Sequence, residues 1–264
     1  TTVAEKGQGV EEEAERMGYT AVPIHFPTSA DSRERNLQLL KVLDFDAMIV
    51  LKGGLHPHQI REKYRLGDMP TVVVNQTIDE PGIHCIDIDR EVAMYKAVSY
   101  LISLGHKRLA YLTAPLDGRF AIERKRGIDR AIAETGVEVD VRQSSATLET
   151  GYQITGSLLS GRESERPTAI LAFNDMVAVG ALEAARAHGK SVPGDLSVVG
   201  FDDLFISRHT CPPLTTIHQP WLQMGHLAVR KVDSLLSGTD SERGGLTILE
   251  SPLIVRESTG RPRD

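Results

Sequence analysis

The chain alternates short β-branched runs with helical stretches, and the same order occurs in both of its halves. In the first half the strand-like run AMIVL (47–51) is followed by a helical stretch and by TVVVN (71–75). In the second half AILAF (169–173) is followed by a helical stretch and by LSVVGF (196–201). Short apolar strands separated by helices build βαβ units with parallel strands. The sequence therefore predicts an α/β protein with two similar lobes, each a doubly wound parallel sheet.

The same patterns place the other elements. We expect further strands at 20–25, 84–88 and 108–113, and helices at 5–18, 31–43, 57–66, 90–104, 121–135, 150–160 and 174–189. The last helix begins at the N-cap Asn174 and ends at Gly189. We place the first lobe at 1–114 plus 219–246 and the second at 115–218 plus 247–264.

Composition narrows the class of protein. The 264 residues are 41% hydrophobic and 25% charged, an ordinary globular balance. No apolar run approaches the roughly 18 residues of a membrane span, and no secretory signal pattern occurs at the start. The two cysteines, Cys85 and Cys211, lie far apart, which fits a reducing cytoplasm. The net charge of −6 argues against this segment gripping a phosphate backbone by itself.

Residues 192–219 point to a ligand site. The run LSVVGF ends on the acids Asp202 and Asp203, and an extended stretch with Pro212 and Pro213 follows. In doubly wound sheets, ligands bind just beyond the carboxyl ends of the strands. A strand-end carboxylate followed by an extended crossover is typical of a two-lobed protein that binds its ligand in a cleft between the lobes. The alternative for Asp202 is a purely structural role, as a turn cap or as the partner of an arginine.

Five stretches carry a family resemblance that covers nearly the whole chain. VPGDLSVVGFDD and PPLTTIHQP, together with LGHKRLAYL (104–112), ERKRGI (123–128) and FNDMVAVGAL (173–182), resemble the lactose/galactose repressor (LacI/GalR) family of bacterial transcription regulators. The resemblance implies a periplasmic-binding-protein-like type I fold that acts as a sensor and dimerisation core. It also implies a small polar effector, such as a sugar or sugar derivative, and a homodimer that binds operator DNA through an N-terminal helix-turn-helix head.

The resemblance raises one expectation about the start of the chain. Residues 3–19 resemble the first helix of a lobe, but no strand precedes them in this sequence. In the family that strand is central to the first sheet. We therefore expect the first strand, and the DNA-binding head before it, to lie upstream of Thr1.

The main ligand-binding candidates are Asp202 and Arg124. A carboxylate accepts hydrogen bonds from neighbouring hydroxyls, and a planar guanidinium donates two parallel ones. ERKRGI matches the segment that carries the family's ligand-clamping arginine, which implies that role for Arg124. Asn174 and Asp89 are further candidates, each at the start of a helix that follows a strand. Their alternative role is helix capping alone.

Three more candidates come from the loop APLDGRF and from the crossover. Phe120 is expected either to stack on a sugar face or to be core, and Asp117 to line the pocket. Several relatives carry small or polar residues at these two positions, so the identity of the effector is open. Gln219 is placed either in the cleft lining or in hinge packing.

Other classes of protein find less support. No pair of histidines or cysteines has the spacing of a metal site, and we expect no metal, no cofactor and no catalytic residue. An enzyme of the Rossmann type needs a glycine fingerprint after a strand, and none is present. The alternative with the same fold is the extracytoplasmic sugar-binding subunit of an ABC transporter. LGHKR and PPLTTIHQ favour the regulator.

Overall fold

The chain folds into two compact α/β units. The computed structural model describes residues 2–24, 42–51, 69–143, 145–239 and 244–263. Unit 1 comprises Thr1–Ile88 and Pro220–Glu250, and unit 2 comprises Asp89–Gln219 and Ser251–Asp264, so the chain passes between the units three times. Each unit contains a sheet of mainly parallel strands covered by helices, which confirms the predicted fold class.

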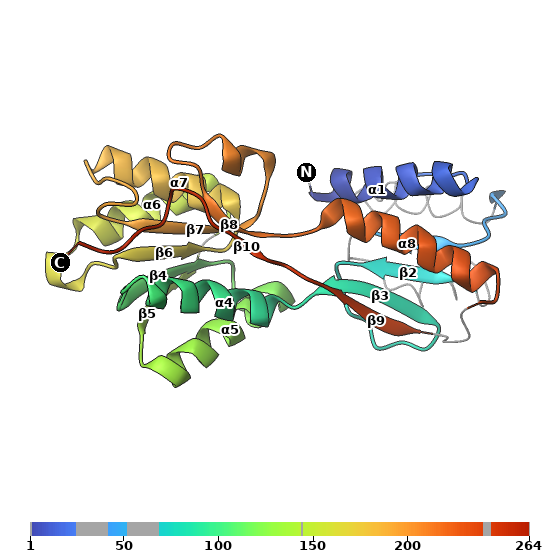
Figure 1. The fold of residues 1–264 in the computed structure, drawn as a ribbon, viewed down its shortest axis with the longest axis horizontal. Helices are drawn as coiled ribbons and strands as arrows, with labels where there is room; N and C mark the ends of the chain where they lie inside the picture. Colours follow the sequence, from blue (N-terminus) through green and yellow to red (C-terminus); the bar gives the residue numbers. More distant parts are fainter. Residues whose placement is uncertain (1, 25–41, 52–68, 144, 240–243, 264) are drawn as a thin grey trace. The chain divides into compact units, whose positions relative to one another are not determined.

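The described residues of unit 1 form a four-stranded sheet in the order β1-β2-β3-β9. All of its strand pairs are parallel. The strands are β1 (Met48–Val50), β2 (Thr71–Val74), β3 (Ile83–Ile88) and β9 (Gly245–Leu249). Two helices, α1 (Thr2–Met17) and α8 (Trp221–Leu236), lie side by side on one face of this sheet (Figure 1).

Unit 2 contains a six-stranded sheet in the order β10-β8-β7-β6-β4-β5. Only β10 runs antiparallel to its neighbour. The strands are β4 (Arg108–Thr113), β5 (Glu138–Gln143), β6 (Ala169–Ala172), β7 (Ser197–Asp202), β8 (Thr215–His218) and β10 (Leu253–Ile254).

Helices cover both faces of this sheet. One face carries α4 (Arg90–Ser103) and α5 (Arg119–Thr135), and the other carries α6 (Leu148–Ser160) and α7 (Asp175–Ala187) (Figure 1). Two 3₁₀ turns, Glu163–Glu165 and Phe205–Arg208, complete the unit.

The core of unit 2 follows the two-residue period of its strands. Ala110, Leu112 and Ile170 pack with the apolar side chains of α6 and α7 in one buried cluster. The intervening residues, such as Tyr111 and Leu171, are also fully buried and belong to the opposite face. Because both faces are buried, these strands are almost continuously apolar, which made them easy to predict.

The ends of the helices agree with the capping residues in the sequence. Asp89 caps α4 by accepting a hydrogen bond from the backbone N–H of Val92 at 2.8 Å. Asn174 caps α7 in the same way, through the N–H of Val177 at 2.9 Å. Gly136 ends α5 with a φ of 71°, a conformation that glycine adopts easily.

The structure corrects one predicted boundary between the lobes. Residues 89–114 were expected in the first lobe but belong to unit 2. The reason is that β4 pairs with both β5 and β6 in the sheet of unit 2, and α4 packs against α5. The other two crossings lie at 219/220 and 250/251, near the predicted ones.

A few predicted elements differ from those observed. Residues 20–24 form no strand, and the stretch after Pro212 and Pro213, which was expected to be an extended crossover, forms β8 over Thr215–His218. The sequence patterns did not indicate β5, α8, β9 or β10. The helix predicted at 57–66 and most of the one at 31–43 lie outside the described residues. Within the described part of the chain, no helix is long and apolar enough to cross a membrane.

Candidate functional site

Arg124 is a buried cation held between two aromatic rings. It lies on α5 with only 3% of its surface exposed. The guanidinium carbon is 4.2 Å from the centre of the Phe173 ring and 3.7 Å from the centre of the Phe201 ring. The guanidinium also donates a hydrogen bond to the carbonyl oxygen of Phe173. Since Phe173 follows β6 and Phe201 lies near the end of β7, this arrangement sets the cation at the carboxyl edge of the sheet.

Asp202 and Gln219 join Arg124 at this edge. A carboxylate oxygen of Asp202, the last residue of β7, lies 3.9 Å from a guanidinium nitrogen of Arg124. The same oxygen accepts a hydrogen bond from the side-chain amide of Gln219, which follows β8. At 3.9 Å the ion pair is too long for a direct hydrogen bond. Three of the seven candidates therefore converge, and two of them form a loose ion pair.

The neighbours of Arg124 offset only part of the unfavourable effect of burying its guanidinium. Burial lowers the pKa of the Arg124 guanidinium, whereas the neighbouring Asp202 carboxylate raises it. An arginine nevertheless stays charged in a protein. The Nε of Arg124 and the Oε1 of Gln219 are buried and have no hydrogen-bond partner among the described residues. Buried polar atoms are almost always hydrogen-bonded, so these two atoms are exceptions within the cluster.

Asn174 and Asp89 both serve as helix caps. Beyond its capping bond, the Asn174 amide donates to the carbonyl oxygen of Ala146 at 3.1 Å, so both ends of its side chain are in use. Asp89 is exposed, and its side chain accepts the capping hydrogen bond. The capping role is thus shown for both residues, and their contact with a ligand stays a prediction.

Phe120 and Asp117 lie at the start of α5, outside the Arg124 cluster. The Phe120 ring is partly exposed, with the guanidinium carbons of Arg90 and Arg119 4.3 and 5.9 Å from its centre. Arg90 is buried and also forms an ion pair with Glu123 at 3.2 Å. Phe120 is therefore not plain core. Asp117 is exposed in the turn before the helix.

Two buried acids near the site were missed by sequence reasoning. Asp175 follows the cap Asn174, and Asp203 follows Asp202, so each stands beside a residue that was singled out. Asp175 accepts hydrogen bonds from Thr216 at 2.5 Å and from the N–H of Leu204 at 2.7 Å. Burial, outweighing the Thr216 hydrogen bond, raises the pKa of Asp175 to about 7. The FND and FDD runs were the available signal, but only the fold shows that their second acids are enclosed.

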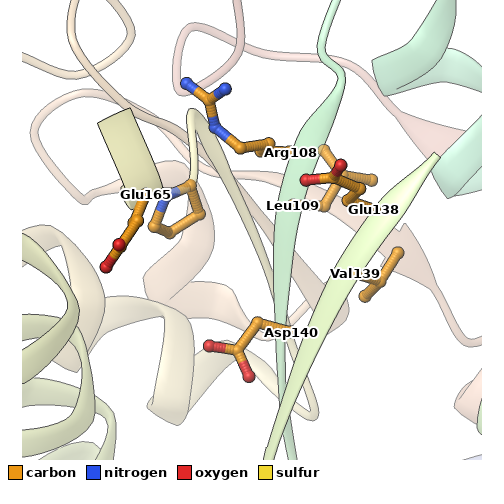
Figure 2. A pocket seen from close by; sticks show the side chains of 7 residues that line it. Arg108, Leu109, Glu138, Val139, Asp140 and Glu165 are labelled. Atoms are coloured by element: carbon orange, nitrogen blue, oxygen red, sulfur yellow. The ribbon is translucent and has the colours of Figure 1, made fainter. Parts of the chain in front are cut away.

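A shallow groove of about 200 Å³ lies at the other edge of the same sheet. It is lined by residues at the starts of β4 and β5, including Arg108 and Glu138, and by Glu165 (Figure 2). The groove contains none of the candidate residues. Among the described residues, no group of three or more His, Cys, Asp or Glu side chains is arranged to hold a metal ion.

Comparisons with known proteins agree with this architecture. The fold, with its strand-end polar cluster, defines a periplasmic-binding-protein-like domain, and the family model described as "Periplasmic binding protein-like domain" matches residues 98–259. The regulator MalR of Streptomyces coelicolor is 36% identical over 258 residues, covering 92% of this chain and 73% of its own. The repressor PurR of Aliivibrio fischeri is 30% identical over 243 residues, covering 91% and 72%.

A solved structure extends the comparison. The sugar-binding transcriptional regulator of the LacI family from Escherichia coli, in complex with phosphate, has a TM-score of 0.80 and 26% identity, covering 98% of this chain and 93% of that one. This chain therefore belongs to the lactose/galactose repressor (LacI/GalR) family of transcription regulators, as the five sequence stretches predicted.

Proposed function

We propose that this chain is the effector-sensing core of a transcription repressor, and that a small polar effector binds at the carboxyl edge of the unit 2 sheet. The effector is a sugar or sugar derivative. Arg124, Asp202 and Gln219 bind it directly, Asn174 and Asp89 contribute from the neighbouring helix starts, and Phe120 and Asp117 border the site.

The buried guanidinium of Arg124 is the observation that carries this proposal. Burying a charge is unfavourable unless it is paired and hydrogen-bonded. Besides the carbonyl of Phe173 and the two rings, Arg124 has the Asp202 carboxylate at 3.9 Å, beyond direct hydrogen-bond distance. A ligand with vicinal hydroxyls supplies acceptors to the guanidinium and donors to Asp202 at the same time. The sugar-binding relative with the same fold supports this class of effector.

Effector binding is coupled to DNA binding only through a difference in the effector's affinity for two conformational states. An effector shifts a two-state equilibrium only if it binds one state more tightly than the other. The relatives named as helix-turn-helix regulators support placing the DNA-binding head outside residues 1–264. The head and the effector site are then thermodynamically linked, so operator DNA changes effector affinity by the same factor as the effector changes operator affinity.

Titration calorimetry with D-ribose, D-glucose, D-galactose and D-fructose tests the site. We expect one of these sugars or a close derivative to bind, and Arg124→Ala to weaken that binding by about 2–4 kcal/mol, because a charge-assisted contact is lost. Arg130→Ala is the matched control, since Arg130 lies on the same helix with 48% of its side chain exposed. Equal affinity of the Arg124 variant and the wild type contradicts the site. A wild-type protein that binds no sugar contradicts the effector class.

A gel shift tests the regulatory part of the proposal separately. The full-length gene product should bind a palindromic site in its own upstream DNA, with an affinity that falls steeply with salt. Residues 1–264 alone, with a net charge of −6, should not bind it. Absence of sequence-specific binding by the full-length product favours the transporter alternative.

A further inference from the structure

The turn that carries Asp202 has an unfavourable backbone conformation. Asp202 and Asp203 have φ angles of 119° and 54°, in the region that residues with a side chain rarely adopt. Two consecutive residues of this kind persist only when their surroundings hold them, and such turns cluster at functional sites. The question is what holds this turn.

One side of the turn is held through the Asp203 side chain, which is 4% exposed. Its first carboxylate oxygen accepts a hydrogen bond from Arg256 at 2.5 Å and one from the Ser207 hydroxyl at 3.1 Å. Its second oxygen lies 3.0 Å from the Nδ1 of His218. Hydrogen bonds and charge from Arg256 outweigh burial and lower the pKa of Asp203, so the group is a carboxylate.

Arg256 is itself fixed in place. It follows β10, and its guanidinium donates to the carbonyl oxygen of Leu214 at 2.7 Å and to the Ser207 hydroxyl at 3.0 Å. The arginine thereby ties the end of β7 to the residues that enter β8. Both carboxylate oxygens are engaged and the side chain is 4% exposed, so Asp203 is not accessible to a ligand.

The other side of the turn is held by Asp175. Its carboxylate accepts the N–H of Leu204, the residue after the turn, and the hydroxyl of Thr216. That hydroxyl oxygen in turn lies 3.4 Å from the backbone nitrogen of Asp203. Asp202 directly precedes the two anchored residues, and its carboxylate faces Arg124 and Gln219.

We propose that the Asp203–Arg256 ion pair is a positioning element of the effector site, which fixes the direction of the Asp202 carboxylate without touching the effector. This inference rests on the proposed function of Asp202. Consecutive residues in a turn share a peptide plane, so releasing Asp203 lets the plane rotate toward common φ values and turns the Asp202 side chain away from Arg124.

Two variants and one matched control test the proposal by titration of the same four sugars. Asp203→Asn and Arg256→Met each remove one charge of the pair. Asp195→Asn is the control, because Asp195 pairs with Arg263 at 2.8 Å before the opposite end of β7. We expect both test variants to bind the sugar at least about tenfold more weakly, the loss associated with a charged hydrogen bond. The control should bind it like the wild type.

A double-mutant cycle separates positioning from a general loss of structure. In an Asp202→Asn background, Asp203→Asn should cause no further loss of affinity, because its effect passes through Asp202. An equal additional loss in that background overturns the proposal. If Arg256→Met does not fold, Arg256→Gln replaces it, which also removes the charge, and the same tenfold criterion applies.

A crystal structure of the Asp203→Asn variant gives a readout that needs no sugar. We expect Asp202 to leave the left-handed region and to lose its hydrogen bond from Gln219. An unchanged Asp202 conformation overturns the positioning role, even where no sugar binds. If Asp202→Asn weakens binding and Asp203→Asn does not, the inference fails while the proposed function stands.

Discussion

At the scale of single residues, unit 2 contains a carboxyl group whose environment opposes ionisation. Asp175 is fully buried, and its side chain accepts hydrogen bonds from two neutral donors, the Thr216 hydroxyl and the N–H of Leu204. Burial raises its pKa to about 7, the Thr216 hydrogen bond works against this shift, and the charge of Asp202 adds to it. The residue therefore stabilises its surroundings best when it is neutral.

This environment predicts a pH-dependent effect of Asp175→Asn on stability. Between the ordinary value of 3.8 and about 7, the folded protein holds the Asp175 proton more strongly than the unfolded chain does. The contribution of Asp175 to stability is therefore complete below pH 4, falls as the pH rises toward 7, and is constant above. Asparagine avoids this loss and retains an acceptor for Leu204. We expect the variant to gain a few kcal/mol over the wild type at pH 8 and nothing near pH 4.

Chemical denaturation of both proteins across this pH range measures the effect. Asp195→Asn provides a control of opposite sign, because hydrogen bonds from Ser191 lower the pKa of Asp195. That variant should lose stability at neutral pH, and the loss should fade in acid. A difference between Asp175→Asn and the wild type that does not change with pH contradicts the prediction.

At the scale of elements, glycines allow the helix pairs to pack closely. In unit 2, a Cβ on Gly180 of α7 would lie 2.0 Å from the carbonyl oxygen of Leu148 and 2.7 Å from the nitrogen of Tyr152, both on α6. In unit 1, a Cβ on Gly9 of α1 would lie 2.2 Å from the carbonyl oxygen of Leu222 on α8. Neither contact can be relieved by a side-chain rotation, because the clashing atoms are backbone.

Gly180→Ala should therefore destabilise the protein despite the better helix propensity of alanine. Overpacking of this kind costs about 1–3 kcal/mol, whereas the gain in propensity is at most about 1 kcal/mol. Urea denaturation gives the difference. Glu183→Ala, at an exposed position on the same helix, should change stability by less than about 0.5 kcal/mol. A Gly180→Ala variant as stable as the wild type would mean that α6 and α7 can move apart at no cost.

Elements with a buried face or a cap were predictable from local sequence. The run RLAYLT and the caps Asp89 and Gly136 define β4, α4 and α5 to within about two residues. The edge strand β5 was missed because EVDVRQ alternates valine with charged residues and is largely exposed. Strand β9 was missed for a related reason, since Leu246 and Ile248 are about half exposed.

The site was predictable only in part. Arg124, Asp202 and Gln219 were found through strand-end position and family resemblance. The rings of Phe173 and Phe201 that enclose the guanidinium follow from the pairing of β6 with β7, which no local pattern shows. Asp203 and Arg256 are 53 positions apart in the chain, so their contact depends on the complete sheet.

At the scale of the whole molecule, we expect a homodimer. Two DNA-binding heads that read a palindromic site require two copies, and an isologous two-fold interface is the commonest arrangement. Sedimentation at micromolar concentration should show a species of about twice the 28.9 kDa chain mass. A single 28.9 kDa species throughout a concentration series, for the full-length product as well as for residues 1–264, contradicts this expectation.

Because the chain passes between the units three times, both units include residues that are translated late and close together. Residues 245–249 supply β9 of unit 1, and residues 253–254 supply β10 of unit 2. Arg256 and then Ser258, which bonds β7 and β8 through its hydroxyl, follow directly. Neither sheet can therefore be completed until this late stretch has left the ribosome. A premature stop codon before residue 245 leaves neither unit whole, so it yields no half-protein with an intact effector site.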